Sequence, residues 1–252
     1  MQMLQTFPEI TRSLLALEQF QFEEFIEAAC KKLERLANEF HDEVLSNGKH
    51  KSFRTALTFR RYLCTEGFRV LMEPESECFT LCGTLLNNGG SCLGLTTLHI
   101  VLGEMAELPL QTVLFEGHIV PVYMDGEIPL YIETTQRSTI MHKHSIQHLH
   151  GTPIKFLSTE EFLAVHLSNR ASLVYAKAGL MDDAIFLIDS ALEIFPDYAA
   201  GWINRAVMMQ KLENTDEMKR SLDTAKSLNP GYRHKSAIEQ IENNNTSTMK
   251  IT

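Results

Sequence analysis

A glycine pair followed by serine and cysteine is the feature that most constrains how this chain can fold. The stretch from Asn87 to Leu98 reads NNGGSCLGLTTL, and apolar side chains recur at helical spacing from Leu93 to Met105. This pattern predicts that Cys92 lies where a loop becomes a helix. The unpaired amide groups and positive dipole end of a helix N-terminus stabilise a thiolate. The glycines are expected to let a substrate backbone come close.

Three short strands are predicted after this helix. They cover Thr112 to Glu116, His118 to Tyr123 and Ile128 to Glu133, and an Asp-Gly pair at Asp125 marks a hairpin between the last two. His118 and Glu133 should therefore lie on paired antiparallel strands that pack against the helix beginning at Cys92. The chain thus presents a cysteine, a helix, a histidine on one strand and an acid on the next.

The motif Gly90-Ser91-Cys92-Leu93-Gly94-Leu95, followed by Gly117-His118 and an acid 15 positions later, resembles a known family. It is similar to the transglutaminase-like branch of the papain-fold cysteine enzymes, and more narrowly to the bacterial SirB-type proteins with a tetratricopeptide tail. The resemblance covers residues 55 to 135 and 158 to 232. It implies that Cys92 is the nucleophile, that His118 is its base and that Glu133 orients the imidazole.

Two further polar residues near this motif have candidate roles. The amide of Cys92 and the Asn88 side chain are candidate donors to a developing oxyanion. His99 is a rival base, but it lies seven residues into the predicted helix and should point away from the thiol. We therefore expect His99 to be a packed core histidine.

Two groups of residues raise the alternative of a metal site. His142, His144, His148 and His150 fall in the polar segment from Thr134 to Thr152, and imidazole is a common ligand of zinc and copper. Cys78 and Cys82, four apart, can share a helix face. No acid or cysteine at ligand spacing completes the histidine set, and no second pair accompanies the cysteines. We therefore favour a histidine-rich surface loop at the rim of the cleft, and expect no metal and no cofactor.

An internal repeat marks the C-terminal part of the chain. Ser158 and Glu161 form a capping box that opens a helix expected to run to Gly179. Pro196 and Pro230 are 34 residues apart, and other residue pairs recur at the same period, which is typical of tetratricopeptide repeats.

These patterns predict an α+β protein, with a papain/transglutaminase-like core of N-terminal helices and a small antiparallel sheet, followed by an all-α tetratricopeptide-like tail. The predicted divisions are a core over residues 1–157, helical repeats over 158–235 and a disordered tail over 236–252. From Pro8 to Leu45 we expect an amphipathic helix pair or one broken helix, then a helix from Ser52 to Thr65 and a short one from Glu75 to Leu86.

Composition limits the classes of function that the chain can have. The formal net charge of −9 argues against a nucleic-acid groove, and no apolar run reaches the ~18 residues that a membrane span needs. Five cysteines at irregular spacing indicate reduced thiols in a cytoplasm. The predicted function is cysteine-dependent acyl transfer on a protein or peptide, as a protease, deamidase or transglutaminase-like hydrolase. The alternative is a non-catalytic scaffold that binds a protein partner through the repeat helices.

Overall fold

The computed structural model describes residues 6–18, 23–46, 53–71, 76–125, 128–136, 139–151 and 154–249. The chain divides into two compact units, Met1–Leu157 and Ser158–Thr252, and each is described by itself. Helices are combined with a five-stranded antiparallel sheet, so the protein belongs to the α+β class. Within the described ranges, no helix is both long and apolar enough to cross a bilayer.

Three helices open the first unit: α1 (Glu9–Leu17), α2 (Glu23–Ser46) and α3 (Phe53–Thr65). The amphipathic pattern from Pro8 to Leu45 is therefore a helix pair. Their apolar faces supply much of the core through Leu14, Leu15, Leu33, Leu36, Phe40 and Phe59, all at most 1% exposed.

The short helix predicted from Glu75 to Leu86 is wrong in one respect, because two elements occupy the described part of this segment. A 3-10 helix, η2 (Ser76–Phe79), precedes α4 (Leu81–Asn87), and Thr80 separates them with an extended backbone. The Thr80 hydroxyl accepts a hydrogen bond from the N–H of Gly83, and a helix start capped in this way cannot continue the preceding turn. Cys78 and Cys82 consequently lie on different elements, which removes the shared helix face that suggested a metal pair.

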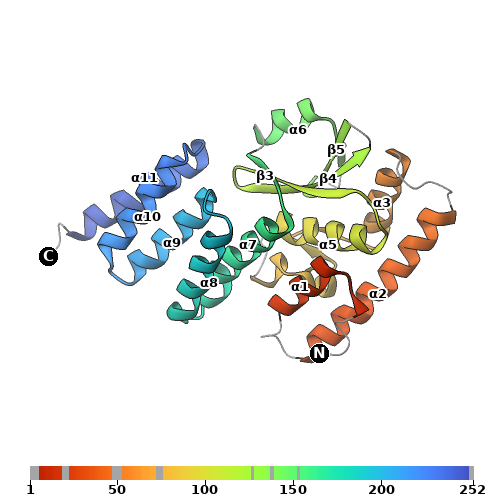
Figure 1. The fold of residues 1–252 in the computed structure, drawn as a ribbon, viewed down its shortest axis with the longest axis horizontal. Helices are drawn as coiled ribbons and strands as arrows, with labels where there is room; N and C mark the ends of the chain where they lie inside the picture. Colours follow the sequence, from red (N-terminus) through yellow and green to blue (C-terminus); the bar gives the residue numbers. More distant parts are fainter. Residues whose placement is uncertain are drawn as a thin grey trace. The chain divides into compact units, whose positions relative to one another are not determined.

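The sheet of the first unit has the strand order β6-β5-β4-β3-β7. Its strands are β3 (Leu110–Phe115), β4 (His118–Asp125), β5 (Ile128–Glu133), β6 (Thr139–Met141) and β7 (Lys155–Leu157). The antiparallel pairing predicted for β4 and β5 is confirmed. Helices α5 (Cys92–Met105) and α6 (Lys143–His150) cover opposite faces of this sheet (Figure 1).

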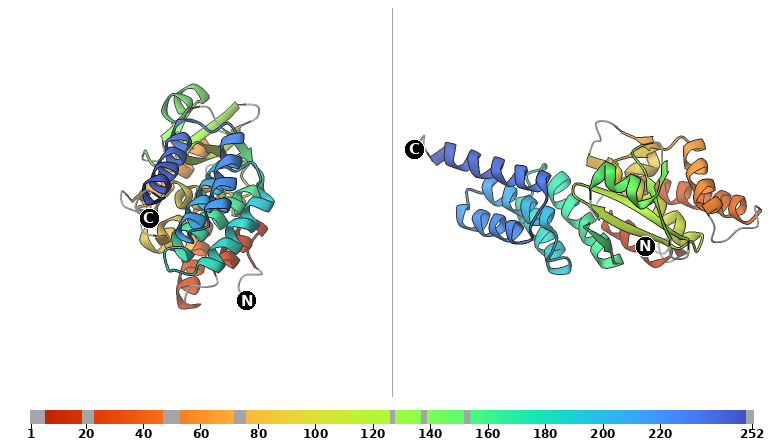
Figure 2. Two further views of the ribbon diagram at one scale, coloured as in Figure 1. Left: turned by 90° about the vertical axis from the view of Figure 1, so that its left-hand side faces the viewer. Right: turned by 90° about the horizontal axis from the view of Figure 1, so that it is seen from above.

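The second unit is helical, and Figure 2 gives two further views of its helices. It contains α7 (Thr159–Arg170), α8 (Met181–Ile194), α9 (Ala199–Lys211), α10 (Thr215–Ser227) and α11 (Tyr232–Met249). The predicted capping box at Ser158 is confirmed. The first helix ends earlier than expected, because a π-helical turn over Ala171–Tyr175 follows α7.

The expectation of a disordered segment over 236–252 is corrected for residues 236–249, because α11 continues to Met249, and residues 250–252 lie outside the described residues. Ile238 and Ile241 explain the difference. They are buried in one cluster with Ile203 of α9 and Leu222 of α10, so the start of this polar segment carries an apolar face that the neighbouring helices cover.

Candidate functional site

Cys92 is the first residue of α5, as the sequence predicts. Ser91 is the N-cap: its backbone is extended, and its hydroxyl accepts a hydrogen bond from the N–H of Gly94 at 3.3 Å. The N–H of Ser91 donates to the carbonyl of Cys78 at 2.8 Å, which fixes the entry of the chain into the helix. Cys92 is therefore a half-buried residue in the first turn of α5. The backbone N–H groups of this turn have no acceptor within the helix.

The glycines around Cys92 accommodate the protein's own backbone. Gly89 and Gly90 form β2, which pairs in parallel with β1 (Arg69–Val70). A Cβ atom at Gly90 would lie 2.6 Å from the carbonyl oxygen of Cys78, and one at Gly94 would lie 2.3 Å from the same oxygen. This packing corrects the expectation that the glycines leave room for a substrate, because the chain itself fills the space beside them.

His118 and Glu133 come together because β4 begins at the edge of the sheet where β5 ends. His118 pairs with Phe115, and Val122 pairs with Tyr131, so the alternation of side chains puts His118 and Glu133 on one face. His118 Nε2 lies 2.9 Å from Glu133 Oε2. The other carboxylate oxygen accepts hydrogen bonds from Thr135, at 2.7 Å from its N–H and 2.5 Å from its hydroxyl.

The side chain of Cys92 also lies close enough to the imidazole of His118 to help raise the pKa of that histidine. Since Nε2 faces Glu133, the nitrogen that remains for the thiol is Nδ1. The three predicted residues therefore form a continuous chain of contacts from sulfur to imidazole to carboxylate.

The electrostatics of this chain favour a charged imidazole and a charged carboxylate. Burial lowers the pKa of His118, but its interactions with Cys92 and Glu133 outweigh burial and raise the pKa to about 9. Burial raises the pKa of Glu133, yet His118 and the two Thr135 donors outweigh it and lower the pKa to about 2. Glu133 is fully buried, so this carboxylate depends on these partners for its stability as an anion.

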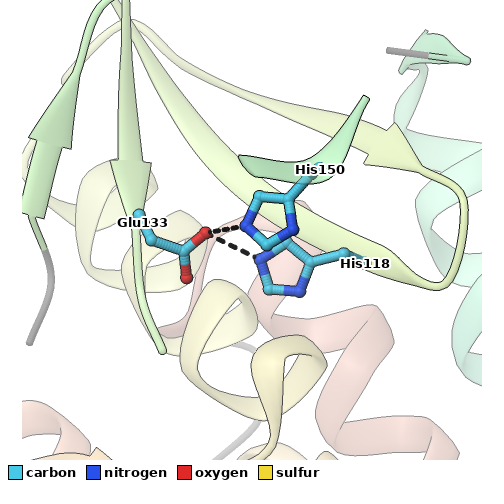
Figure 3. Close-up of side chains that lie close together, drawn as sticks. All are labelled: His118, Glu133 and His150. Carbon is cyan, nitrogen blue, oxygen red and sulfur yellow. Dashed lines mark hydrogen bonds and ion pairs between the residues drawn. The ribbon is translucent and has the colours of Figure 1, made fainter. Parts of the chain in front are cut away.

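A residue that the sequence analysis did not assign to the site, His150, completes the arrangement (Figure 3). Its Nε2 atom lies 2.5 Å from the same Oε2 atom of Glu133 that faces His118. The two imidazole rings stack, with centroids 3.9 Å apart and planes 23° apart. The Oε2 atom of Glu133 therefore contacts one imidazole nitrogen from each of the two histidines.

His150 reaches the site because the segment expected to be a histidine-rich loop is partly helical. It is the last residue of α6, and Ile146, one turn earlier, packs among Val113, Phe115 and other apolar residues of the sheet. Positions four apart share a helix face, so burial of Ile146 turns His150 inward as well. His142, His144 and His148 are exposed instead, so the four histidines do not form one site.

The contacts of Asn88 and His99 indicate that both residues have structural roles. Asn88 is the C-cap of α4 with a positive φ of 49°, and its side-chain oxygen accepts a hydrogen bond from Lys32. His99 is 1% exposed, its Nδ1 lies 2.7 Å from the carbonyl oxygen of Leu95, and its ring packs on Phe59. Burial lowers the pKa of His99 to about 4, so it is a neutral core residue.

Comparison with known proteins gives little beyond this geometry. No family model matches the chain, and no curated protein matches its sequence. Among solved structures, the chain is similar to menin, whose crystal structure is described as revealing the binding site for Mixed Lineage Leukemia protein. The TM-score is 0.47 at 12% identity, and the alignment covers 82% of this chain and 60% of the menin chain. A likeness this distant carries no argument about function.

Proposed function

We propose that this protein is a cysteine-dependent acyl-transfer enzyme that acts on a protein or peptide. The observation that carries the proposal is the chain of contacts from Cys92 through His118 to Glu133. A packed core cysteine needs neither a histidine at its thiol nor a buried carboxylate behind that histidine. The arrangement is the one that nucleophilic catalysis uses: a nucleophile, a base within hydrogen-bond reach and a third group that orients the base.

The reaction follows from the assigned atoms. His118 Nδ1 accepts the thiol proton, and the sulfur of Cys92 forms a bond to the substrate carbonyl carbon. The tetrahedral intermediate places its negative oxygen at the start of α5, where the Cys92 N–H is a candidate donor. Collapse of the intermediate breaks the bond to the leaving group, which takes the proton from His118. Water or an amine then attacks the thioester and releases Cys92.

A hollow on the second unit supports the alternative that the tail binds a partner without catalysis. It encloses about 440 Å³, and its lining includes Trp202, Arg205 and Arg220 together with Asp189 and Glu217. Arg205 donates hydrogen bonds to Asp189 at 2.7 Å and to Glu217 at 3.1 Å, which connect three of the residues that line the hollow. A hollow that is lined by an aromatic ring and by charged side chains fits a peptide-binding role, either alone or in support of the proposed enzyme.

The test is the rate at which iodoacetamide labels Cys92 near pH 6.5, followed residue by residue with mass spectrometry. Cys64, which is exposed, serves as the reference thiol in the same molecule. About 1% of an ordinary thiol is ionised at this pH. We expect Cys92 to react about tenfold or more faster than Cys64, because His118 accepts its proton.

Two variants sharpen this test. His118→Ala should bring the labelling rate of Cys92 down toward that of Cys64, whereas His148→Ala, at an exposed position on α6, should leave it unchanged. Thermal unfolding of both variants shows whether the fold survives. Equal rates for Cys92 and Cys64 in the wild type, unaltered by His118→Ala, would rule out the enzyme and favour the scaffold.

A further inference from the structure

The nitrogen and oxygen atoms around Glu133 form a compact donor cluster. The imidazole–carboxylate cluster consists of His118, Glu133 and His150, and one ligand atom from each lies within 4.8 Å of the others. The three come from the start of β4, the end of β5 and the end of α6. We propose that this cluster is a binding site for a divalent first-row transition metal such as Zn²⁺.

The donor types and their spacing support this assignment. Two imidazole nitrogens and one carboxylate oxygen are common ligands of Zn²⁺, which binds both atom types at ~2.0–2.1 Å. In a tetrahedral site such bonds put neighbouring ligand atoms ~3.3 Å apart. The Nε2 atoms of His118 and His150 lie 2.9 Å and 2.5 Å from Glu133 Oε2, so a small outward movement makes room for the ion. Because the rings are now stacked, one of them must also turn to aim its lone pair at the metal.

The hydrogen bonds around Glu133 orient its carboxylate for metal binding. Both Thr135 donors hold Oε1 and leave Oε2 directed at the two imidazoles. Hydrogen bonds of this kind orient ligating carboxylates and strengthen metal binding. His150 has a side chain only 12% exposed, and Glu133 is fully buried, so the ion would lie in a site of low dielectric constant where its attraction to the carboxylate is strong.

Metal binding and the proposed catalysis are mutually exclusive, a consequence that rests on the proposed function. The ion needs the Nε2 lone pair of His118, whereas the triad needs a proton there for the hydrogen bond to Glu133. A metal on Nε2 keeps the imidazole proton on Nδ1, where it faces Cys92, and His118 can no longer accept a proton from the thiol. The thiol itself stays outside the coordination sphere, because Nδ1 and Nε2 point to different sides of the ring. The site would therefore switch the enzyme off without a bond to sulfur.

The test is metal binding by the full-length protein, measured without reference to activity. Metal-free protein is dialysed against Zn²⁺ for stoichiometry and affinity, and titrated with Co²⁺ for its absorption spectrum. We expect one tightly bound ion per chain and cobalt d–d bands without the charge-transfer band of a thiolate–cobalt bond. Nitrogen-15 NMR of the histidines should show that His118 loses the proton on Nε2 and keeps the proton on Nδ1.

Three variants decide the outcome. His150→Gln should weaken binding by about tenfold or more, while His148→Gln, at an exposed site on the same helix, should bind as the wild type does. Cys92→Ala should retain the metal although it abolishes labelling at that position. The proposal fails if Zn²⁺ does not bind, if His150→Gln binds equally well, or if Cys92→Ala loses the ion, since the last result indicates simple thiol binding. None of these results alters the labelling test of the triad.

Discussion

Acid should destabilise the helical tail through one buried histidine, His166 of α7. The side chain is 5% exposed and packs edge-on against Phe162, with ring centroids 4.9 Å apart. Burial, and to a smaller extent the positive charge of Arg170, together lower its pKa from 6.5 to about 3. In the folded tail His166 is therefore neutral at any pH above about 3, whereas in the unfolded chain it binds a proton below ~6.5.

The sign and size of the effect follow from this difference. Between the two pKa values the unfolded chain holds one more proton at His166 than the folded chain, so stability falls as the pH falls. Each pH unit corresponds to ~1.4 kcal/mol. The contribution is complete above pH ~6.5, and lowering the pH to 4 should remove ~3 kcal/mol, a large part of the stability of an ordinary domain.

Trp202 makes this loss of stability measurable, because it is the single tryptophan of the chain and packs against two apolar clusters of the second unit. Urea unfolding followed by its fluorescence at several pH values between 7 and 4 gives the pH dependence of tail stability. His166→Leu should remove the contribution of this residue and leave that of all other groups, so the difference between the two proteins isolates it. Parallel curves for wild type and His166→Leu would refute the reasoning.

Three further substitutions test how the elements are held. Gly94→Ala should destabilise the first unit by ~1–3 kcal/mol and slow Cys92 labelling, because the new methyl group meets the Cys78 carbonyl. Hydrogen exchange of α5 checks the first effect. Ser158→Ala should lower tail stability by ~1 kcal/mol in the Trp202 assay, since it removes the N-cap of α7. Glu104→Ala should increase amide exchange in α1, because the Glu104 carboxylate accepts three hydrogen bonds from the first turn of that helix.

The sequence was most informative where local chemistry decides the structure. The glycine pair and the apolar spacing after Cys92 predicted the helix start, and α5 does begin at Cys92, where the Ser91 hydroxyl accepts a hydrogen bond from an N–H of the first turn. The same logic located the start of α7 at the capping box of Ser158. The antiparallel pairing of β4 and β5 followed from the short connection between them, which also brought His118 and Glu133 to one end of the sheet.

Long-range packing was beyond these local patterns. The extended backbone of Thr80 is fixed in part by Glu18, whose buried carboxylate accepts hydrogen bonds from the N–H groups of Leu81 and Cys82. No pattern near residue 80 indicates a partner 63 positions away. The crowding at Gly94 also depends on a residue distant in sequence, because the carbonyl group that a Cβ atom would meet there belongs to Cys78.

His150 shows what the missing information was. Its signal was present, since Ile146 and His150 are four apart and an α-helix would put both on one face, but the polar composition around them favoured a loop. Only the packing of Ile146 against the sheet selects the helix, and that selection carries the second imidazole to Glu133. A triad needs one histidine on its carboxylate. With the second histidine, the same buried oxygen could either orient the proposed base or bind the proposed metal. The variant His150→Gln separates these two roles, because it removes one metal ligand and leaves Cys92, His118 and Glu133 in place.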